Sequence, residues 1–238
     1  MDIKLKEIMI LGAQEFGCDL TNEQVDKFDI YRERLKEKNK VMNLTAIDDD
    51  TDVVIKHFID SISILPFING ENIKLLDIGT GAGFPGLPIK IIRSDVDVTL
   101  VDSVNKKVNF INELISELCL NDVCAIHSRA EDLGVLEEHR ESYDIVTARA
   151  VSTLSVLCEY CIPFLKVGGI FLAMKGGNLQ ETESCEDAIK ILGGEIEEIR
   201  EFNLPFTDNH RKIIVIKKFR QTPSRYPRKS GKARKNPL

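Results

Sequence analysis

The sequence lacks a long apolar run. No segment of its 238 residues approaches the roughly 18 consecutive apolar residues that a membrane-spanning helix needs. The first 17 residues hold only a short apolar patch, interrupted by Gly12 and Gln14, and have no small-residue cleavage site like that of a secretory signal. These absences predict a cytoplasmic protein without a membrane segment.

Cysteines with the paired spacing of a metal site are missing as well. The six cysteines are scattered, and only Cys158 and Cys161 form a CxxC motif. A redox or metal role stays open for this pair, although it lies in an apolar helical stretch with no second pair nearby. Small buried side chains are the alternative interpretation. We predict no bound metal.

Acidic residues are absent from the last 30 residues. This stretch holds 11 Lys and Arg, so the preceding residues carry 21 basic and 38 acidic side chains and a net charge of −17, against −6 for the whole chain. Such asymmetry predicts a polyanion contact. RNA is favoured over a membrane, because no amphipathic apolar face accompanies the charges. Residues 220–238 are poor in apolar side chains and are expected to form a flexible basic tail that becomes ordered on a partner, or one that serves only solubility.

Two different periodicities divide the rest of the chain. Helical periodicity predicts an N-terminal helical cap over residues 1–70, with a Thr21–Gln24 capping box opening its second helix. Within residues 71–219, strand-like apolar runs alternate with helical segments, which indicates an α/β, doubly wound parallel sheet. Seven strands are expected, at residues 73–79, 97–102, 122–127, 143–149, 168–175, 194–202 and 211–219. The last two strands are too close for a crossover helix between them, so they must be antiparallel.

A glycine-rich turn directly after the first strand predicts a cofactor site. It reads Asp77-Ile-Gly79-Thr-Gly81-Ala-Gly83. Ligands of doubly wound sheets bind at the carboxyl ends of central strands, and glycines let them approach the backbone closely.

Two cofactor classes fit this turn. Residues 81–86 satisfy the dinucleotide pattern GxGxxG, but the glycine that abuts the strand is Gly79, so the pattern is out of register. Asp77 can accept hydrogen bonds from a cationic amino group, and S-adenosylmethionine carries an α-ammonium and no phosphate. The antiparallel pair also resembles the seven-stranded, Rossmann-like sheet of methyltransferases. We therefore predict S-adenosylmethionine, with Asp102 at the ribose hydroxyls, Ser103 beside it, and residues 128–132 bordering the adenine.

Six segments from Asn43 to Gly176 carry a resemblance to a known family. They are NLTAI (43–47), HFIDSISIL (57–65), LLDIGTGAGFPGLPIKI (75–91), SRAEDL (128–133), TARAVSTL (147–154) and MKG (174–176). The chain resembles the bacterial 16S rRNA guanine-N7 methyltransferases, also called the glucose-inhibited division protein B family. The resemblance implies methylation of N7 of one guanine in 16S rRNA of the small ribosomal subunit. By matching positions it places five residues at the cofactor: Gly79, Phe84, Ala130, Glu131 and Arg149.

Direct attack of guanine N7 on a sulfonium methyl group requires no general base, so catalysis would depend on positioning and electrostatics. Arg149, at the end of the fourth strand, is the main catalytic candidate: it could anchor the cofactor carboxylate, a phosphate or guanine O6, or form only a surface ion pair. Asn43 and Lys175 are hypothetical residues of the base pocket. His57 could be structural or contact the substrate, Glu131 could cap a helix, and Phe84 could stack on a ring or pack the turn.

Seven tail side chains are expected to bind RNA phosphate, the tyrosine also by stacking on a base: Arg225, Tyr226, Arg228, Lys229, Lys232, Arg234 and Lys235. A methyltransferase with a non-RNA substrate, a nicotinamide oxidoreductase and a non-catalytic RNA-binding assembly factor remain the alternatives. We expect a monomer.

Overall fold

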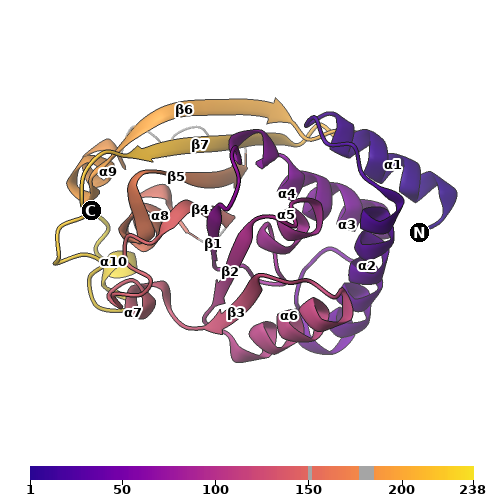
Figure 1. Ribbon diagram of the computed structural model, residues 1–238, viewed down its shortest axis with the longest axis horizontal. Coiled ribbons are helices and arrows are strands. Elements are labelled where there is room, and N and C mark those ends of the chain that lie inside the picture. The colour runs from indigo at the N-terminus through magenta and orange to yellow at the C-terminus, as the bar shows by residue number, and fades with distance from the viewer. Residues whose placement is uncertain (150–151, 177–184) are drawn as a thin grey trace.

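A seven-stranded sheet runs through the middle of the molecule in the order β3-β2-β1-β4-β5-β7-β6 (Figure 1). Its strands are β1 (Lys74–Ile78), β2 (Asp97–Asp102), β3 (Val123–His127), β4 (Tyr143–Arg149), β5 (Leu165–Gly176), β6 (Gly194–Asn203) and β7 (His210–Lys218). The first five strands are parallel, and β7 is antiparallel to both of its neighbours, β5 and β6. The predicted doubly wound sheet with an antiparallel last pair is confirmed.

The computed structural model describes residues 1–149, 152–176 and 185–238. Its helices are α1 (Ile3–Gln14), α2 (Asn22–Met42), α3 (Asp50–Val53), the π-helix η1 (Val54–Ile59), α4 (Asp60–Ile62), η2 (Leu65–Phe67), α5 (Gly86–Ile92), α6 (Asn105–Glu117), α7 (Ala130–Leu133), α8 (Leu154–Cys161), η3 (Ile162–Phe164), α9 (Glu186–Leu192) and α10 (Lys232–Lys235). The Thr21–Gln24 capping box at the start of α2 is confirmed. In the described part of the chain, every helix is too short or too polar to span a membrane.

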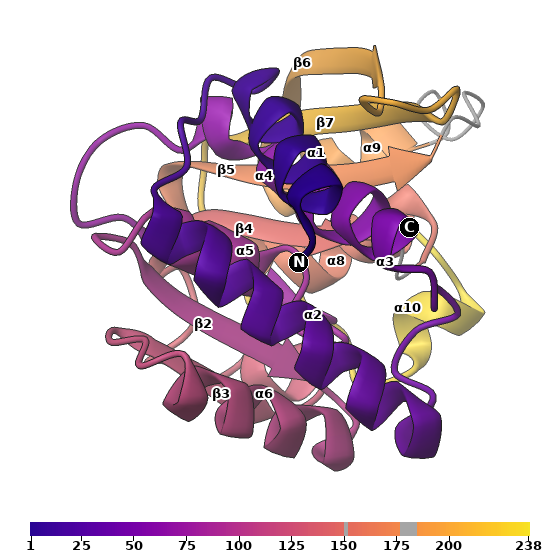
Figure 2. The same cartoon turned by 90° about the vertical axis from the view of Figure 1, so that its right-hand side faces the viewer.

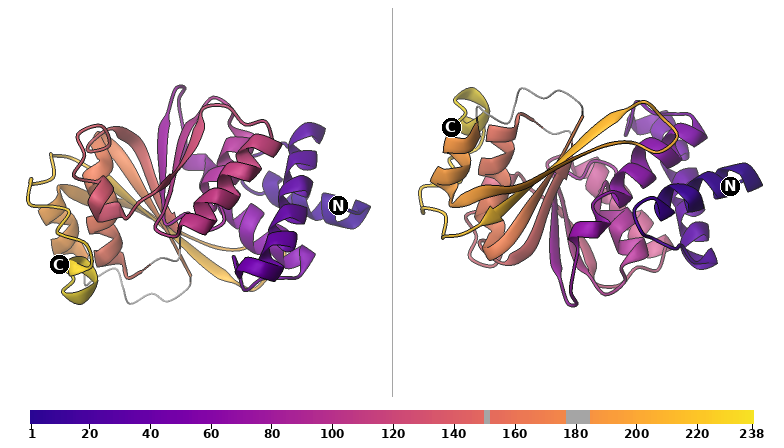
Figure 3. Two further views of the ribbon diagram at one scale, coloured as in Figure 1. Left: turned by 90° about the horizontal axis from the view of Figure 1, so that it is seen from below. Right: turned by 90° about the horizontal axis from the view of Figure 1, so that it is seen from above.

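Helices cover both faces of the sheet, as the two views of Figure 3 show. Successive residues of a strand point to opposite faces, so Leu75 joins one hydrophobic cluster and Leu76 the other. The Leu75 cluster unites the sheet with the N-terminal helices through Phe28 and Phe58. Residues 1–70 therefore share a hydrophobic core with the sheet. The Leu76 cluster lies under α8 and α9.

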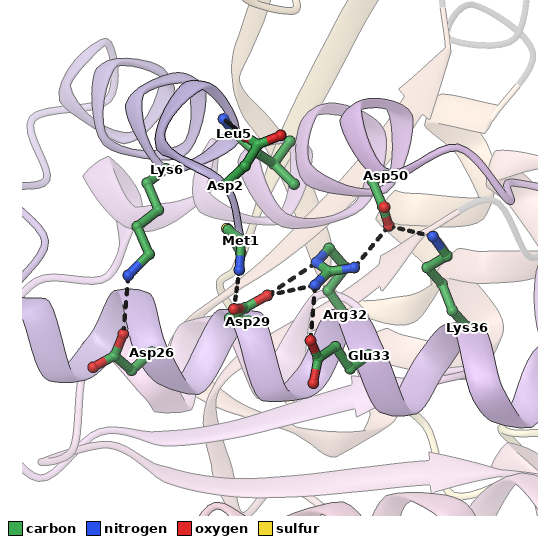
Figure 4. A network of polar contacts seen from close by, with 10 residues as sticks. All are labelled: Met1, Asp2, Leu5, Lys6, Asp26, Asp29, Arg32, Glu33, Lys36 and Asp50. Atoms are coloured by element: carbon green, nitrogen blue, oxygen red, sulfur yellow. Dashed lines mark hydrogen bonds and ion pairs between the residues drawn. The ribbon is translucent and has the colours of Figure 1, made fainter.

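An ionic network joins the N-terminal helices, which lie together over one side of the molecule (Figure 2). Arg32 of α2 donates to Asp29 at 2.7 Å and to Asp50 at 2.9 Å (Figure 4). Asp50 is also paired with Lys36 at 2.7 Å, and the ammonium group of Met1 is paired with Asp29. Because Asp50 begins α3, these contacts fix α3 and the segment after it relative to α2.

The prediction of a flexible tail is wrong, because residues 220–238 pack against α7 and α8 (Figure 1). Tyr226 is buried in the Leu76 cluster. Arg228 donates two hydrogen bonds to Oε2 of Glu159 in α8, at 2.5 and 3.0 Å. Arg140 donates to the backbone carbonyl of Tyr226 at 2.7 Å. The composition of the segment alone does not reveal these long-range partners, which is why it suggested disorder.

Candidate functional site

The glycine-rich turn after β1 is held in shape from beneath by Asp77. Its Oδ2 accepts hydrogen bonds from Thr80 Oγ1 at 2.6 Å and from the Gly86 amide at 2.9 Å. The side chain is fully buried, and its Oδ1 has no hydrogen-bond partner within the described residues. Burial raises the pKa of this carboxyl to about 6. Asp77 thus offers one unused acceptor under the turn.

The three glycines of the turn differ in what they contact. Gly79 has a φ of 70° and lies on the wall of a cavity. Gly83 has a φ of 107°, and a Cβ there would come within 2.6 Å of both Leu87 and the Tyr31 hydroxyl. Gly81 donates its amide hydrogen to Asp102 at 2.9 Å. Gly79 therefore faces the cavity, while Gly81 and Gly83 give the turn its course.

The first cavity, of about 340 Å³, opens at the carboxyl ends of β1 to β4. That volume falls in the range of small-molecule sites, about 300–1,000 Å³. Six predicted cofactor residues line it: Gly79, Asp102, Ser103, Ala130, Glu131 and Arg149. The structure therefore brings together side chains that are up to 70 residues apart in the sequence.

Sequence reasoning missed one wall of this cavity. Tyr160 of α8 lines it, and so do Gly231 and Arg234 from the C-terminal segment. The Gly231 amide donates to Glu131 Oε1 at 2.9 Å, which joins that segment to α7. No signal in the sequence links Gly231 and Arg234 to the glycine-rich turn, because only the packing of residues 220–238 brings them there, and Tyr160 comes from α8.

A second cavity, of about 350 Å³, lies at the ends of β4, β5 and β7. Arg149 lines both cavities. Lys175, a hypothetical base-pocket residue, is on the wall of the second cavity. Asn43 lines neither: it is exposed and ends α2 with a φ of 48°, a left-handed conformation that asparagine tolerates.

Arg149 is held by an ion pair that lies mostly out of solvent. Its Nη1 is 3.0 Å from Asp60 Oδ2, and the two side chains are 14% and 6% exposed. The same atom donates to the Lys56 carbonyl at 3.2 Å. The Arg149 Cζ lies 5.0 Å from the centre of the Phe84 ring. Arg149 does form an ion pair, but the pair is buried between the two cavities.

Phe84 packs the turn against the N-terminal helices. Its ring stacks on Tyr31 of α2, with centroids 5.2 Å apart, and on His57 of η1 at 4.5 Å. His57 Nε2 lies 2.8 Å from the Thr45 hydroxyl, and burial lowers the pKa of the imidazole to about 3. The imidazole is therefore neutral at ordinary pH. Phe84 packs the turn through these two rings, and its contact with the cofactor stays a prediction.

The candidate RNA-binding side chains of the C-terminal segment fall into two groups. Tyr226 is buried and Arg228 is bound to Glu159, which leaves neither free to contact phosphate in this conformation. The other five are exposed: Arg225, Lys229, Lys232, Arg234 and Lys235. Their contact with RNA stays a prediction.

The CxxC cysteines behave as small buried side chains. Cys158 and Cys161 are fully buried free thiols, and burial raises the pKa of both. A high pKa disfavours the thiolate that redox chemistry and metal binding require. Among the described residues, no cluster of His, Cys, Asp or Glu could hold a metal ion.

Comparison with known proteins gives matches along the whole chain. Residues 24–214 match the family model of "rRNA small subunit methyltransferase G". The Ribosomal RNA small subunit methyltransferase G of Acetivibrio thermocellus is 56% identical and aligned over 100% of this chain and 98% of its own length. That of Desulforamulus reducens is 50% identical over 95% of each.

Solved structures show the same fold at low identity. M. jannaschii TYW2 in complex with AdoMet has a TM-score of 0.52 and 18% identity over 65% of this chain and 72% of its own. The [4+2]-cyclase SpnF has a TM-score of 0.51 and 15% identity, over 63% of this chain and 75% of its own. Since one of these is a cyclase by its name, the fold by itself does not fix the reaction.

Proposed function

Since the chain belongs to the rRNA small subunit methyltransferase G family, we propose that it transfers a methyl group from S-adenosylmethionine to N7 of a guanine in 16S rRNA. The family membership confirms the resemblance seen in six sequence segments. The protein is an S-adenosylmethionine-dependent methyltransferase of small-subunit rRNA; the guanine and its N7 atom are the proposed part. The observation that carries the proposal is the first cavity, which is built around Gly79 and Arg149.

The residues of this cavity, and those under the turn beside it, fit S-adenosylmethionine. Asp77 lies under the turn and not on the cavity wall, but its buried Oδ1 has no partner among the described residues, and an ammonium group that reached the end of β1 would supply one. Asp102 accepts from the amides of Gly81 and Val104, one on each oxygen, and retains lone pairs for ribose hydroxyls. Ala130, one of the residues expected at the adenine, lines the cavity with a small side chain.

When bound, S-adenosylmethionine supplies an electrophilic methyl group on a sulfonium. Guanine N7 has an exposed lone pair, so the chain has no proton to remove before transfer. His57 and Arg149 agree with this, because the low pKa of His57, about 3, makes it a weak base, and Arg149 is a cation held by Asp60. The contribution of the chain is then to hold two reactants in line and to exclude water.

Methyl transfer to purified small ribosomal subunits, with mass mapping of the product, tests the proposal. We expect label from S-adenosylmethionine on N7 of a single guanine. Label on another base would keep the enzyme class and refute the N7 assignment. Thermal protection by S-adenosylmethionine but not by NAD would exclude the oxidoreductase alternative independently. We also propose that the enzyme is a monomer and that it binds the small ribosomal subunit in the cytoplasm.

Asp77→Asn is expected to change how stability depends on pH and, separately, to lower the affinity for S-adenosylmethionine. The folded pKa of Asp77, about 6, is above the unfolded value, so the folded state binds more protons and stability falls as pH rises from 3.8 to about 6. The asparagine variant lacks this loss, so its free energy of unfolding should stay level between pH 5 and pH 8, where that of the wild type should fall by about 1 kcal/mol. Its affinity for S-adenosylmethionine should fall, because the ammonium group loses its charged partner.

Urea unfolding at pH 5 and pH 8, with calorimetric titration of the cofactor, checks both parts. Asp97→Asn, which removes the same charge from an exposed position at the start of β2, is the control. If Asp77→Asn were less stable at pH 8 than at pH 5 by the same margin as the wild type, the buried carboxylate would not be the cause.

A further inference from the structure

We propose that the second cavity receives the target guanine, splayed out of the RNA, with its N7 and O6 edge toward Arg149. This inference rests on the proposed function and assigns the substrate side of the same site. Enzymes that act on a base commonly take it out of its stack into a fitted pocket. The second cavity, of about 350 Å³, offers such a pocket next to the first.

The placement of the cavity follows from the sheet. Arg149, the last residue of β4, pairs with Met174 of β5, and Met174 pairs with Ile213 of β7. All three line the second cavity, whereas the first opens on the β1–β3 side of β4. Among the described residues, Arg149 is the one shared by both cavities. A methyl group transferred from a cofactor in the first cavity to a base in the second would therefore pass beside Arg149.

The chemistry of the walls suits a purine. One part of the wall is apolar, formed by Ile47, Met174, Phe202 and Ile213. The rest carries cationic side chains, among them Lys175, which donates to the Ser152 carbonyl, and Lys212, which is paired with Glu201 at 2.8 Å. Guanine offers an apolar face for the first part and two adjacent acceptors, N7 and O6, for the second. Adenine places a donor beside N7, which a cationic wall disfavours.

Asp60 holds the two arginines of this cavity in place. Its Oδ2 binds Arg149 Nη1 at 3.0 Å, and its Oδ1 binds Arg211 Nε at 2.8 Å. The π-helix η1 ends directly before Asp60 and turns the carbonyls of Lys56 and His57 toward Arg149. Single π-turns are frequent at functional sites. Asp60 also offsets positive charge, which matters because methylation at N7 leaves the base cationic.

Ile47→Trp tests the inference by filling the cavity from its edge. Ile47 is partly exposed and lies in the loop after α2, where it packs against the Leu75 cluster, so the melting temperature of the variant is measured together with its activity. We expect cofactor affinity within about twofold of the wild type and a loss of methyl transfer to small subunits of at least 100-fold. Ile47→Phe should lose less, and Val41→Trp, which adds the same ring at a position 78% exposed, should lose none.

Three results would overturn the inference. One is full transfer activity in Ile47→Trp with an unchanged melting temperature. Another is a loss of cofactor affinity in Ile47→Trp as large as its loss of methyl transfer, which would assign this cavity to the cofactor. The third is a flatter salt dependence of RNA binding, which would mean that the cavity holds a phosphate, since each phosphate contact steepens that dependence. Failure of the wild type to methylate N7 would instead refute the proposed function.

Discussion

Replacing Arg228 with alanine is expected to lower the free energy of unfolding by about 3–5 kcal/mol, because the change leaves a buried carboxylate without its cation. The Glu159 side chain is 0% exposed. It accepts from the Arg228 amide at 2.8 Å, from Nε at 2.9 Å and from Nη2 at 2.5 Å. Alanine keeps only the first of these hydrogen bonds. Chemical denaturation, followed by circular dichroism, measures the effect.

Two further variants identify the cause. Lys229→Ala, an exposed neighbour in the same segment, should change stability by less than about 0.5 kcal/mol. Glu159→Gln combined with Arg228→Ala should be more stable than Arg228→Ala alone, because it removes the unpaired charge. If the double variant were the less stable of the two, packing of the segment rather than charge would explain the loss.

Gly79→Asp is expected to abolish binding of S-adenosylmethionine, with an affinity loss of at least 100-fold. Gly79 lies on the wall of the first cavity, so a side chain there takes space from the ligand. The φ of 70° adds strain for any residue with a Cβ. The added carboxylate would also lie in a cavity that Asp102 and Glu131 already line, so it would increase the repulsion between negative charges there.

Gly17→Asp provides a matched control. Gly17 has a φ of 72°, a Cβ there would meet no atom within 4 Å, and the residue is exposed near the end of α1. It reproduces the backbone strain and the new charge far from the cavity. Calorimetric titration of both variants should show normal affinity for Gly17→Asp. Near-normal affinity in Gly79→Asp would mean that the cofactor binds elsewhere.

Local patterns predicted the sheet well, because strand and turn signals are contained in short windows. The apolar run that became β1, the capping box at Thr21 and the short spacing between β6 and β7 each determined a structural element without help from the rest of the chain. The glycine-rich turn likewise placed the first cavity. Most of the elements of this domain can therefore be predicted from short stretches of neighbouring residues.

Side-chain roles that depend on distant partners were harder to predict. Arg149 is 89 residues from Asp60, and Arg228 is 69 residues from Glu159. Nothing near either arginine in the sequence indicates its carboxylate. Phe84 was equally ambiguous, because its stacking partners come from helices that precede the sheet. Even a correct sheet does not specify which charged groups will meet across its edge.

A nascent chain has all seven strands before it has a complete first cavity. Gly231 and Arg234 leave the ribosome after β7, and so does Arg228, which ties them to α8. Until then Glu131 lacks the amide of Gly231, and Glu159 lacks its cation. Translation thus separates formation of the sheet from completion of the first cavity, because the residues that complete its wall are synthesised after the last strand.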